Sequence, residues 1–186
     1  MGERNTKTKA VKPARDGAPL YSAKLFDELV SLWRQDFPND DATVVEVALR
    51  ARLLADLEER ALQDVLADFR VSVGDSDVLL ILSRDGAPAQ IRPSDIAALC
   101  GVSTGAVTGR LDRLQARGYV SRESSTDDKR TFFVTLTPQG RALGLQVRQA
   151  LNARSRFLIA LREFPADELL QLNMLLAKLN QRLIAG

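Results

Sequence analysis

The chain has 186 residues but no histidine, a single cysteine and a single tryptophan, and these shortages exclude several kinds of site. Without histidine, the chain cannot form a histidine-ligated zinc site, a Ser-His-Asp triad or a Cys-His pair. Cys100 cannot form a disulfide within the chain, which agrees with a reducing cytoplasm. The sequence also contains no Walker motif and no dinucleotide-binding fingerprint. We therefore expect a protein that is not an enzyme and that needs neither a metal nor a cofactor.

The chain also has no long apolar run and only a small net charge. Apolar residues make up 45% of the chain, which is enough for a core, but no run approaches the length of a membrane span. Residues 1–19 are polar and basic and lack the apolar stretch of a signal peptide. We therefore expect a disordered basic tail, no membrane partner and a cytoplasmic location.

Basic side chains are concentrated in one part of the sequence, although the net charge is only +2. Six of them lie between positions 110 and 130, namely Arg110, Arg113, Arg117, Arg122, Lys129 and Arg130. A local basic stripe is typical of a specific DNA-binding protein. The alternative interpretation is a charged face that only contacts solvent.

Residues 92–136 follow the element order of a winged helix-turn-helix: a short helix, a turn, a second helix and a two-stranded hairpin. Pro93 suits the first turn of the short helix, and Gly101 can take the left-handed conformation of the turn. Ser103 is a good N-cap for the second helix, which we expect to run to about Arg117. By their helical spacing, the residues of the second helix that face the core are Val107, Leu111 and Leu114.

Gly118 is expected to end the second helix, and strands at 120–123 and 131–136 follow with a charged tip between them. A helix-turn-helix places its second helix in the DNA major groove, and a basic hairpin can reach the neighbouring backbone. The predicted contacts with an operator in double-stranded DNA are Ser103, Thr104, Thr108, Arg113, Lys129 and Arg130. An ordinary α+β surface with scattered charges is the alternative.

The flanks of this unit are predicted to be helical. The expected helices cover residues 20–36, 43 to about 69, 137 to about 162, and 165 onward, with a short apolar segment at 76–84. The first helix has an apolar face of Leu25, Leu29, Leu32 and Trp33, and the last has a stripe of Leu169, Leu172, Leu175, Leu176, Leu179 and Leu183. Such faces pack either within one chain or between two chains. A two-fold dimer is favoured because it places two major-groove helices one DNA turn apart.

The expected fold is therefore mostly α with a small β-hairpin wing (α+β), a winged helix-turn-helix with a helical dimerisation region. The predicted division is a disordered basic tail at 1–19, N-terminal helices for dimerisation and a ligand-pocket wall at 20–71, a DNA-binding domain at 72–136, and C-terminal dimerisation helices at 137–186.

From about Thr43 onward, the chain resembles the MarR family of bacterial transcription regulators. Asp128-Lys129-Arg130 matches the family's Asp-x-Arg wing signature, and residues 136–141 (Leu-Thr-Pro-Gln-Gly-Arg) match its strand-to-helix junction. The resemblance implies a homodimer joined by its N- and C-terminal helices. It also implies binding to a pseudo-palindromic operator, usually as a repressor.

The helix expected at 20–36 narrows this resemblance to the urate-responsive branch of the family, which adds such a helix. Four positions match that branch, and they are the predicted ligand-binding residues: Trp33, Asp77, Arg110 and Arg122. The resemblance implies that Trp33 and Arg122 hold the ligand, and that Asp77 responds to its negative charge and passes the change to Arg110. The expected effector is a small, flat, anionic aromatic molecule, such as urate, xanthine, salicylate or indole-3-acetate.

Alternatives to this interpretation remain at the level of the sequence. Trp33 could be a core anchor, and Asp77 with Arg110 a purely structural ion pair. A thiol switch through Cys100 would keep DNA binding but change the signal. A helical dimer that sequesters another protein would use no DNA, although the predicted wing keeps its basic residues.

Overall fold

The computed structural model describes residues 23–36, 42–84, 86, 90–124 and 132–185. The chain divides into two compact units between residues 57 and 58, and each unit is described by itself. Among the described residues, no helix is both long enough and apolar enough to cross a membrane. The predicted basic tail lies outside the described residues.

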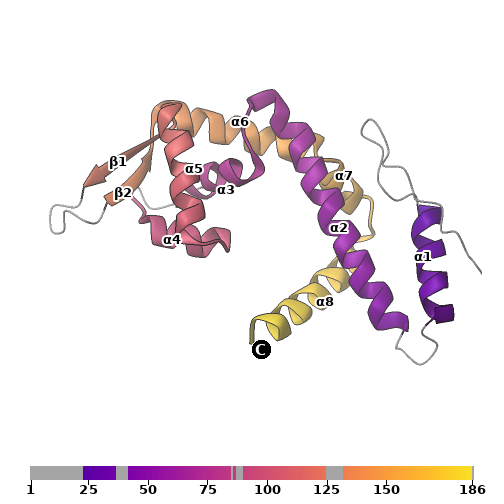
Figure 1. The fold of residues 1–186 in the computed structure, drawn as a ribbon. Coiled ribbons are helices and arrows are strands. Elements are labelled where there is room, and N and C mark those ends of the chain that lie inside the picture. Colours follow the sequence, from indigo (N-terminus) through magenta and orange to yellow (C-terminus); the bar gives the residue numbers. More distant parts are fainter. Residues whose placement is uncertain (1–22, 37–41, 85, 87–89, 125–131, 186) are drawn as a thin grey trace, which may run out of the picture. The chain divides into compact units, whose positions relative to one another are not determined.

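The first unit contains α1 (Ala23–Asp36) and the beginning of α2 (Ala42–Leu66) (Figure 1). Among the side chains of α1 that the structure describes, residues 26–36, the buried apolar ones are Phe26 and Val30. The face predicted from the spacing of the other apolar residues is exposed at Leu29, Leu32 and Trp33, and the side chain of Leu25 lies outside the described part of the structure. The burial follows the contact with α2, because the guanidinium of Arg50 lies 4.9 Å from the centre of the Phe26 ring.

Ion pairs around Glu46 connect α1 with α2 in this first unit. Its carboxylate accepts a hydrogen bond from Arg34 of α1 at 2.9 Å and another from Arg50 of α2 at 2.6 Å. The two guanidiniums lower the pKa of Glu46, with the hydrogen bond from Arg50 as the largest cause. All three side chains touch solvent, so the network orients the helices more than it stabilises them.

The second unit begins within α2 and contains all of the remaining elements. In chain order they are the short 3₁₀ helix η1 (Ala67–Phe69), α3 (Val73–Ser83), α4 (Pro93–Cys100), α5 (Thr104–Ala116), β1 (Val120–Ser124), β2 (Phe132–Leu136), α6 (Pro138–Arg154), α7 (Arg156–Arg162) and α8 (Ala166–Ala185). The described part of the chain is thus mostly helical with one two-stranded antiparallel sheet, as expected.

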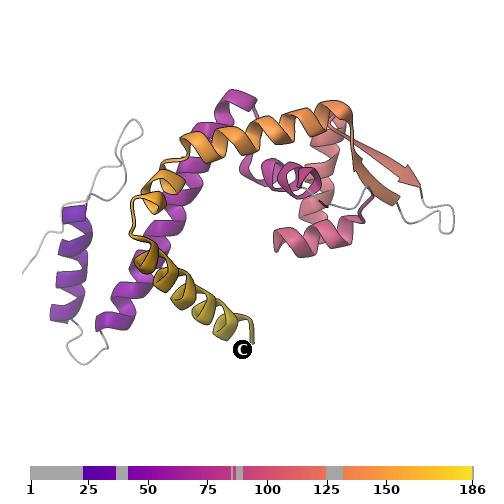
Figure 2. The ribbon, with the colours of Figure 1, turned by 180° about the vertical axis from the view of Figure 1, so that it is seen from behind.

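Helix α3 lies at the centre of the second unit, between α5 and α6 in both views (Figures 1 and 2). Its side chains Val78 and Leu79 are fully buried. They join a core to which the other elements contribute Ile96, Val107, Leu111, Leu114, Val134 and Val147. The short apolar segment predicted at 76–84 is therefore the central helix of the unit, and α5 is held against its surface.

The local signals that define α4 and α5 are confirmed. Pro93 is the first residue of α4, and Gly101 ends that helix with φ of 64°. The hydroxyl of Ser103 accepts a hydrogen bond from the Ala106 amide at 3.3 Å and so caps α5. Gly118 follows α5 with φ of 73°, a conformation that costs glycine little because it has no Cβ. The positions predicted to face the core are buried: Val107, Leu111 and Leu114.

The hairpin pairs Val120 with Leu136 and continues antiparallel to Ser124 and Phe132. Ile91 adds a bridge to Val134, which was not predicted from the sequence. At the junction with α6, the hydroxyl of Thr137 accepts from the Gly140 amide at 3.0 Å and thereby caps the helix. A Cβ on Gly140 would collide with the carbonyl of Tyr119, so this position of the junction requires glycine.

The single helix predicted from 137 to about 162 is wrong, because it is broken at Ser155 into α6 and α7. Ser155 has an extended backbone (φ −64°, ψ 115°) and is almost fully buried. Its hydroxyl accepts from the Leu158 amide at 3.4 Å, while its own amide bonds to the Leu151 carbonyl at 3.0 Å. One residue therefore ends the first helix and caps the second, which helical spacing alone does not reveal.

The last helix, α8, contains no buried residue. Its predicted leucine stripe is partly covered at Leu169 and Leu172 and exposed further along. The exposed large apolar side chains of this helix are Leu170, Met174, Leu175, Leu176, Leu179, Leu183 and Ile184. An apolar surface of this size on one helix is typical of an interface.

Candidate nucleic-acid interface

Opposite its buried stripe, α5 presents a face of small and polar side chains to solvent. The exposed positions at or within α5 are Ser103, Thr104, Gly105, Ala106, Thr108, Asp112, Arg113, Gln115 and Ala116. The hydroxyl of Thr108 donates to the Thr104 carbonyl at 3.0 Å, so it can still accept a hydrogen bond from outside. An exposed helix of this kind, beside a two-stranded hairpin, has the form of a groove-reading helix with a wing.

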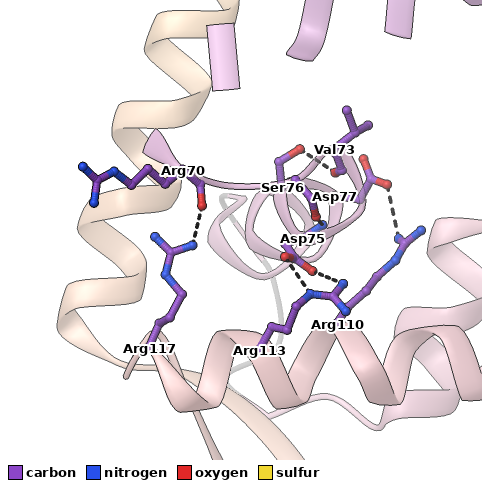
Figure 3. A network of polar contacts seen from close by, with 9 residues as sticks. Arg70, Val73, Asp75, Ser76, Asp77, Arg110, Arg113 and Arg117 are labelled. Carbon is purple, nitrogen blue, oxygen red and sulfur yellow. Dashed lines mark hydrogen bonds and ion pairs between the residues drawn. The ribbon is translucent and has the colours of Figure 1, made fainter. Parts of the chain in front are cut away.

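Three arginines connect α5 to α3 and η1 (Figure 3). Arg113 makes the strongest of these contacts, a two-pronged ion pair with Asp75 of α3. Its Nε lies 3.1 Å from Oδ2, and its Nη2 lies 2.7 Å from Oδ1. The Asp75 side chain is only 7% exposed, and its hydrogen bond raises the pKa of Arg113. The guanidinium that we predicted to contact DNA is thus already bound to a buried carboxylate.

Arg117 holds the end of α5 to the end of η1. Its Nη1 donates to the carbonyl of Arg70 at 2.6 Å, and its Nη2 donates to the carbonyl of Phe69 at 3.3 Å. Carbonyls at a helix end lack partners within the helix, so a guanidinium is well suited to satisfy them. The same guanidinium lies 4.9 Å from the centre of the Tyr119 ring, which ties it to the beginning of the hairpin.

Arg110 makes the weakest of the three contacts. Its Nη1 lies 3.3 Å from Oδ2 of Asp77, and the Asp77 side chain is 42% exposed. The two residues predicted to form the switch are therefore paired. Burial raises the pKa of the Asp77 carboxyl, and the charge of Arg110 opposes this shift. Gly74 makes room for the guanidinium, because a Cβ there would lie 2.7 Å from Cζ of Arg110.

Two other titratable groups lie close to Asp77. Burial raises the pKa of Glu58 on α2, and the charge of Asp77 raises it further. Burial likewise raises the pKa of the Cys100 thiol on α4, with the charge of Asp77 as the next cause. The charge of Asp77 therefore disfavours further negative charge on both of these neighbours.

Arg122 connects the hairpin to α5. Its Nη2 donates to Oδ1 of Asp112 at 2.6 Å, and its guanidinium lies 5.0 Å from the centre of the Phe132 ring. The Nε atom is buried and has no hydrogen-bond partner among the described residues. One donor of this predicted ligand-binding residue is therefore still available to an acceptor.

The other predicted site residues are placed as follows. Trp33 lies in the first unit, whereas Asp77, Arg110 and Arg122 lie in the second. Lys129 and Arg130 of the wing lie outside the described residues. Three further residues were not predicted from the sequence, because each gains its role from a partner that is distant along the chain: Asp75, Asp112 and Gly74.

Comparisons with known proteins agree with this geometry. The MarR family model matches residues 71–131. The chain is 31% identical to the HTH-type transcriptional regulator PecS of Dickeya dadantii, over 84% of this chain and 93% of that protein. It is 30% identical to the multiple antibiotic resistance protein MarR of Salmonella typhimurium, over 66% of this chain and 82% of that one.

Solved structures lead to the same family. A mutant MarR from E. coli, complexed with operator DNA, superposes with a TM-score of 0.64 and 26% identity, covering 80% of this chain and 97% of that one. A MarR-like transcription regulator from Bacillus cereus, at 22% identity and a TM-score of 0.65, covers 76% of this chain and 98% of that one and shares the fold. From the winged unit, the relatives and the shared fold together, we conclude that the chain belongs to the MarR family of DNA-binding transcription regulators.

Proposed function

We propose that the protein is a homodimeric repressor that a small, flat, anionic aromatic ligand releases from a pseudo-palindromic operator. The observation that carries this proposal is the contact between Asp77 and Arg110. It is a single long hydrogen bond at 3.3 Å between a half-exposed carboxylate and the helix that faces DNA. The Asp77 carboxylate can be hydrated when this bond breaks, whereas Arg110 is only 17% exposed and must find a new position, so a ligand that alters Asp77 can alter the position of α5.

The reading of DNA is assigned to the exposed face of α5. Ser103, Thr104 and Thr108 lie on that face, in the half of the helix that a helix-turn-helix presents to base edges. Lys129 and Arg130 remain predicted backbone contacts of the wing. In the operator complex of E. coli MarR, a related chain binds DNA with the same fold, which supports this assignment.

Recognition of an anion is assigned to Arg122. The guanidinium fork suits a carboxylate or an anionic ring, and its buried Nε has no partner among the described residues. An anion near Asp77 would raise the pKa of that carboxyl further, so Asp77 would take up a proton and release Arg110. The part of Trp33 in holding the ligand follows from the family resemblance and stays a prediction.

The homodimer is supported by the apolar surface of α8. Five leucines of this helix are among the exposed large side chains: Leu170, Leu175, Leu176, Leu179 and Leu183. Covering them with a second copy removes apolar area from water and places a second α5 at a fixed distance from the first. Sedimentation equilibrium of the full chain tests this point, and a monomer at every concentration would contradict it.

The ligand is tested by thermal shift with a panel of flat anions that includes urate and indole-3-acetate. A molecule that binds only the folded state raises the unfolding midpoint. We expect a shift for the wild type that is lost in Arg122→Ala. The matched control is Arg92→Ala, since Arg92 lies 5.8 Å from the Phe133 ring in a comparable arginine–aromatic contact. An equal loss in both variants would contradict a specific role for Arg122.

The operator is obtained by selection of bound duplexes from random DNA, followed by fluorescence anisotropy. We expect the selected sequence to be an inverted repeat, and we expect the ligand found by thermal shift to weaken its binding. An effector that leaves operator affinity unchanged would overturn the regulatory part of the proposal. A thiol switch through Cys100 is not favoured, because burial raises the pKa of the thiol and so disfavours the reactive thiolate.

A further inference from the structure

We propose that Asp75 is a positioning residue for DNA recognition, which holds Arg113 and thereby fixes the C-terminal half of α5 as a pivot for its N-terminal half. The positioning role of Asp75 requires only that this chain binds DNA, as regulators of the MarR family do. Movement of the N-terminal half by an effector rests, in addition, on the proposed function. Neither residue would contact DNA itself.

The three arginines of α5 share one face of the helix but differ in their partners. Arg110, Arg113 and Arg117 are spaced three and four residues apart, which places them on that face (Figure 3). Arg113 makes two short hydrogen bonds to one carboxylate, and Arg117 makes two to backbone carbonyls. Arg110 makes one hydrogen bond of 3.3 Å to Asp77 and has a further side-chain hydrogen bond with the Cys100 thiol. Two of the three contacts are therefore strong, and one is weak.

The two carboxylates also differ in burial. The Asp75 side chain is 7% exposed, whereas that of Asp77 is 42% exposed. The Arg113 side chain is 57% exposed, but if it turned fully toward a DNA phosphate it would leave the buried Asp75 carboxylate without its partner, and this is strongly destabilising. Asp77 can be hydrated when Arg110 leaves it. The contact at Asp75 is therefore permanent, and the contact at Asp77 is reversible.

The strong and weak contacts lie at different positions along α5. The two strong contacts lie at Arg113 and Arg117, near the C-terminal end, and the weak contact lies at Arg110, in the middle of the helix. At 1.5 Å per residue, Thr104 lies roughly 13 Å from Arg113, so a tilt of about 10° would move it by roughly 2 Å. Such a displacement is comparable to the difference between a formed and a broken hydrogen bond to a base.

The contact of Arg110 with α3 also depends on Gly74. A Cβ at this position would lie 2.7 Å from both Nε and Cζ of the Arg110 guanidinium. The guanidinium therefore lies directly against the backbone of α3, where a larger residue at position 74 would displace it. Gly105 and Gly109 also lie in the N-terminal two-thirds of α5, where they lower helix propensity and favour local movement.

The test compares Asp75→Asn and Arg113→Gln, singly and together, for binding to the selected operator and to a random duplex over a range of salt concentrations. We expect each single variant to lose about tenfold in operator affinity, the size of one mismatched base pair. The double variant should lose no more than the worse single one, because both changes remove the same contact. Affinity for the random duplex and the salt slope should stay as in the wild type.

A direct contact of Arg113 with phosphate would give a different result. Arg113→Gln would then weaken binding to both duplexes and reduce the salt slope by about one unit, while Asp75→Asn would not weaken binding. A purely structural role would lower the unfolding midpoint of both variants but leave the ratio of operator to random affinity unchanged, measured where both remain folded. Either result overturns the proposal. These measurements use no effector, so their outcome is independent of the proposed ligand response.

Hydrogen exchange tests the pivot without any change at Asp75 or Arg113, through the wild type and Asp77→Asn. We expect the amides of residues 111–116 to exchange slowly and equally with and without operator DNA. The amides of residues 106–110 should exchange faster in Asp77→Asn than in the wild type, because that change removes the charge that holds Arg110. Faster exchange at 111–116 than at 106–110 would overturn the proposal.

Discussion

Helices α5 and α8 both have leucines at helical spacing, yet they differ completely in burial. In α5, Val107, Leu111 and Leu114 are at most 1% exposed, whereas α8 has no buried residue. The difference lies in what covers them. The apolar side of α5 packs against α3 and α4 of the same chain, and α8 has no equivalent cover among the described residues. The single chain itself covers the apolar side of α5, whereas the apolar side of α8 has the character of an interface.

The largest expected effect is a loss of stability from a substitution in the buried side of α5. Replacing the fully buried Leu111 with alanine should lower the free energy of unfolding by about 2–5 kcal/mol, because it removes apolar contacts and leaves a cavity. Urea unfolding measures this loss. We expect Leu175→Ala on α8 to change the unfolding of the dissociated chain by far less. Equal losses for the two variants would contradict the comparison.

The next largest effect is expected on the proposed dimer, from a substitution on the exposed apolar face of α8. Leu179→Asp should weaken the proposed dimer by at least about tenfold, because a carboxylate cannot be buried there without a partner. Sedimentation equilibrium measures the dissociation constant. Gln181→Asp is the matched control, since two residues along a helix of 3.6 residues per turn lie on nearly opposite faces. Dissociation by the control alone would place the interface on the other face.

A smaller loss of stability is expected from a substitution at Ser155, where α6 and α7 meet. Ser155→Ala should cost about 1 kcal/mol, the usual value for a lost N-cap, because the Leu158 amide loses its acceptor. Thermal unfolding measures this effect. Ser94→Ala is the control, since its exposed hydroxyl makes only a 3.4 Å contact with Asp95. A wild-type midpoint for Ser155→Ala would show that burial alone, without capping, determines the break.

The smallest effect concerns pH and the carboxylate of Asp77. Its pKa in the folded protein lies above the ordinary value of 3.8, so the folded state binds the proton more tightly than the unfolded state. The free energy of unfolding contributed by this group is therefore greatest below 3.8 and is lost as the pH rises through the folded pKa. In Asp77→Asn this part of the pH dependence should disappear.

Urea unfolding of both proteins at a series of pH values measures the change, with the exposed Asp64→Asn as the control. A wild-type pH profile for Asp77→Asn would contradict the raised pKa. The stability of Asp77→Asn relative to the wild type should rise with pH, because the unfavourable charge is absent.

Much of the winged unit could be predicted because its signals are local. Ser103, Gly101 and Gly118 define the ends of α4 and α5 through their own backbone preferences and hydrogen bonds. The buried side of α5 follows from helical spacing. The face of α1 was not found in this way, because Phe26 and Val30 are buried by a neighbour that spacing does not identify. For the same reason, the break at Ser155 was missed.

The candidate site shows the same contrast between contacts that could be predicted from the sequence and contacts that could not. The pairing of Asp77 with Arg110 was considered from a family resemblance, and the two side chains do meet. The sequence does not predict the stronger pair of Asp75 with Arg113, and it predicts only a DNA contact for Arg113. Both acidic residues lie in the same short stretch of chain, and nothing in their local sequence shows which one is buried.

By itself, the sequence determined where the helices of the winged unit begin and end, which side of α5 enters the core, and which kinds of catalytic and metal site are excluded by the absence of histidine. These properties depend on single residues and their nearest neighbours. Only the tertiary structure decided which arginine is held by Asp75, which is left on a weak contact with Asp77, and that Arg122 retains a buried donor. The two aspartate–arginine contacts depend on burial and on segments more than thirty residues apart, which local preferences do not encode.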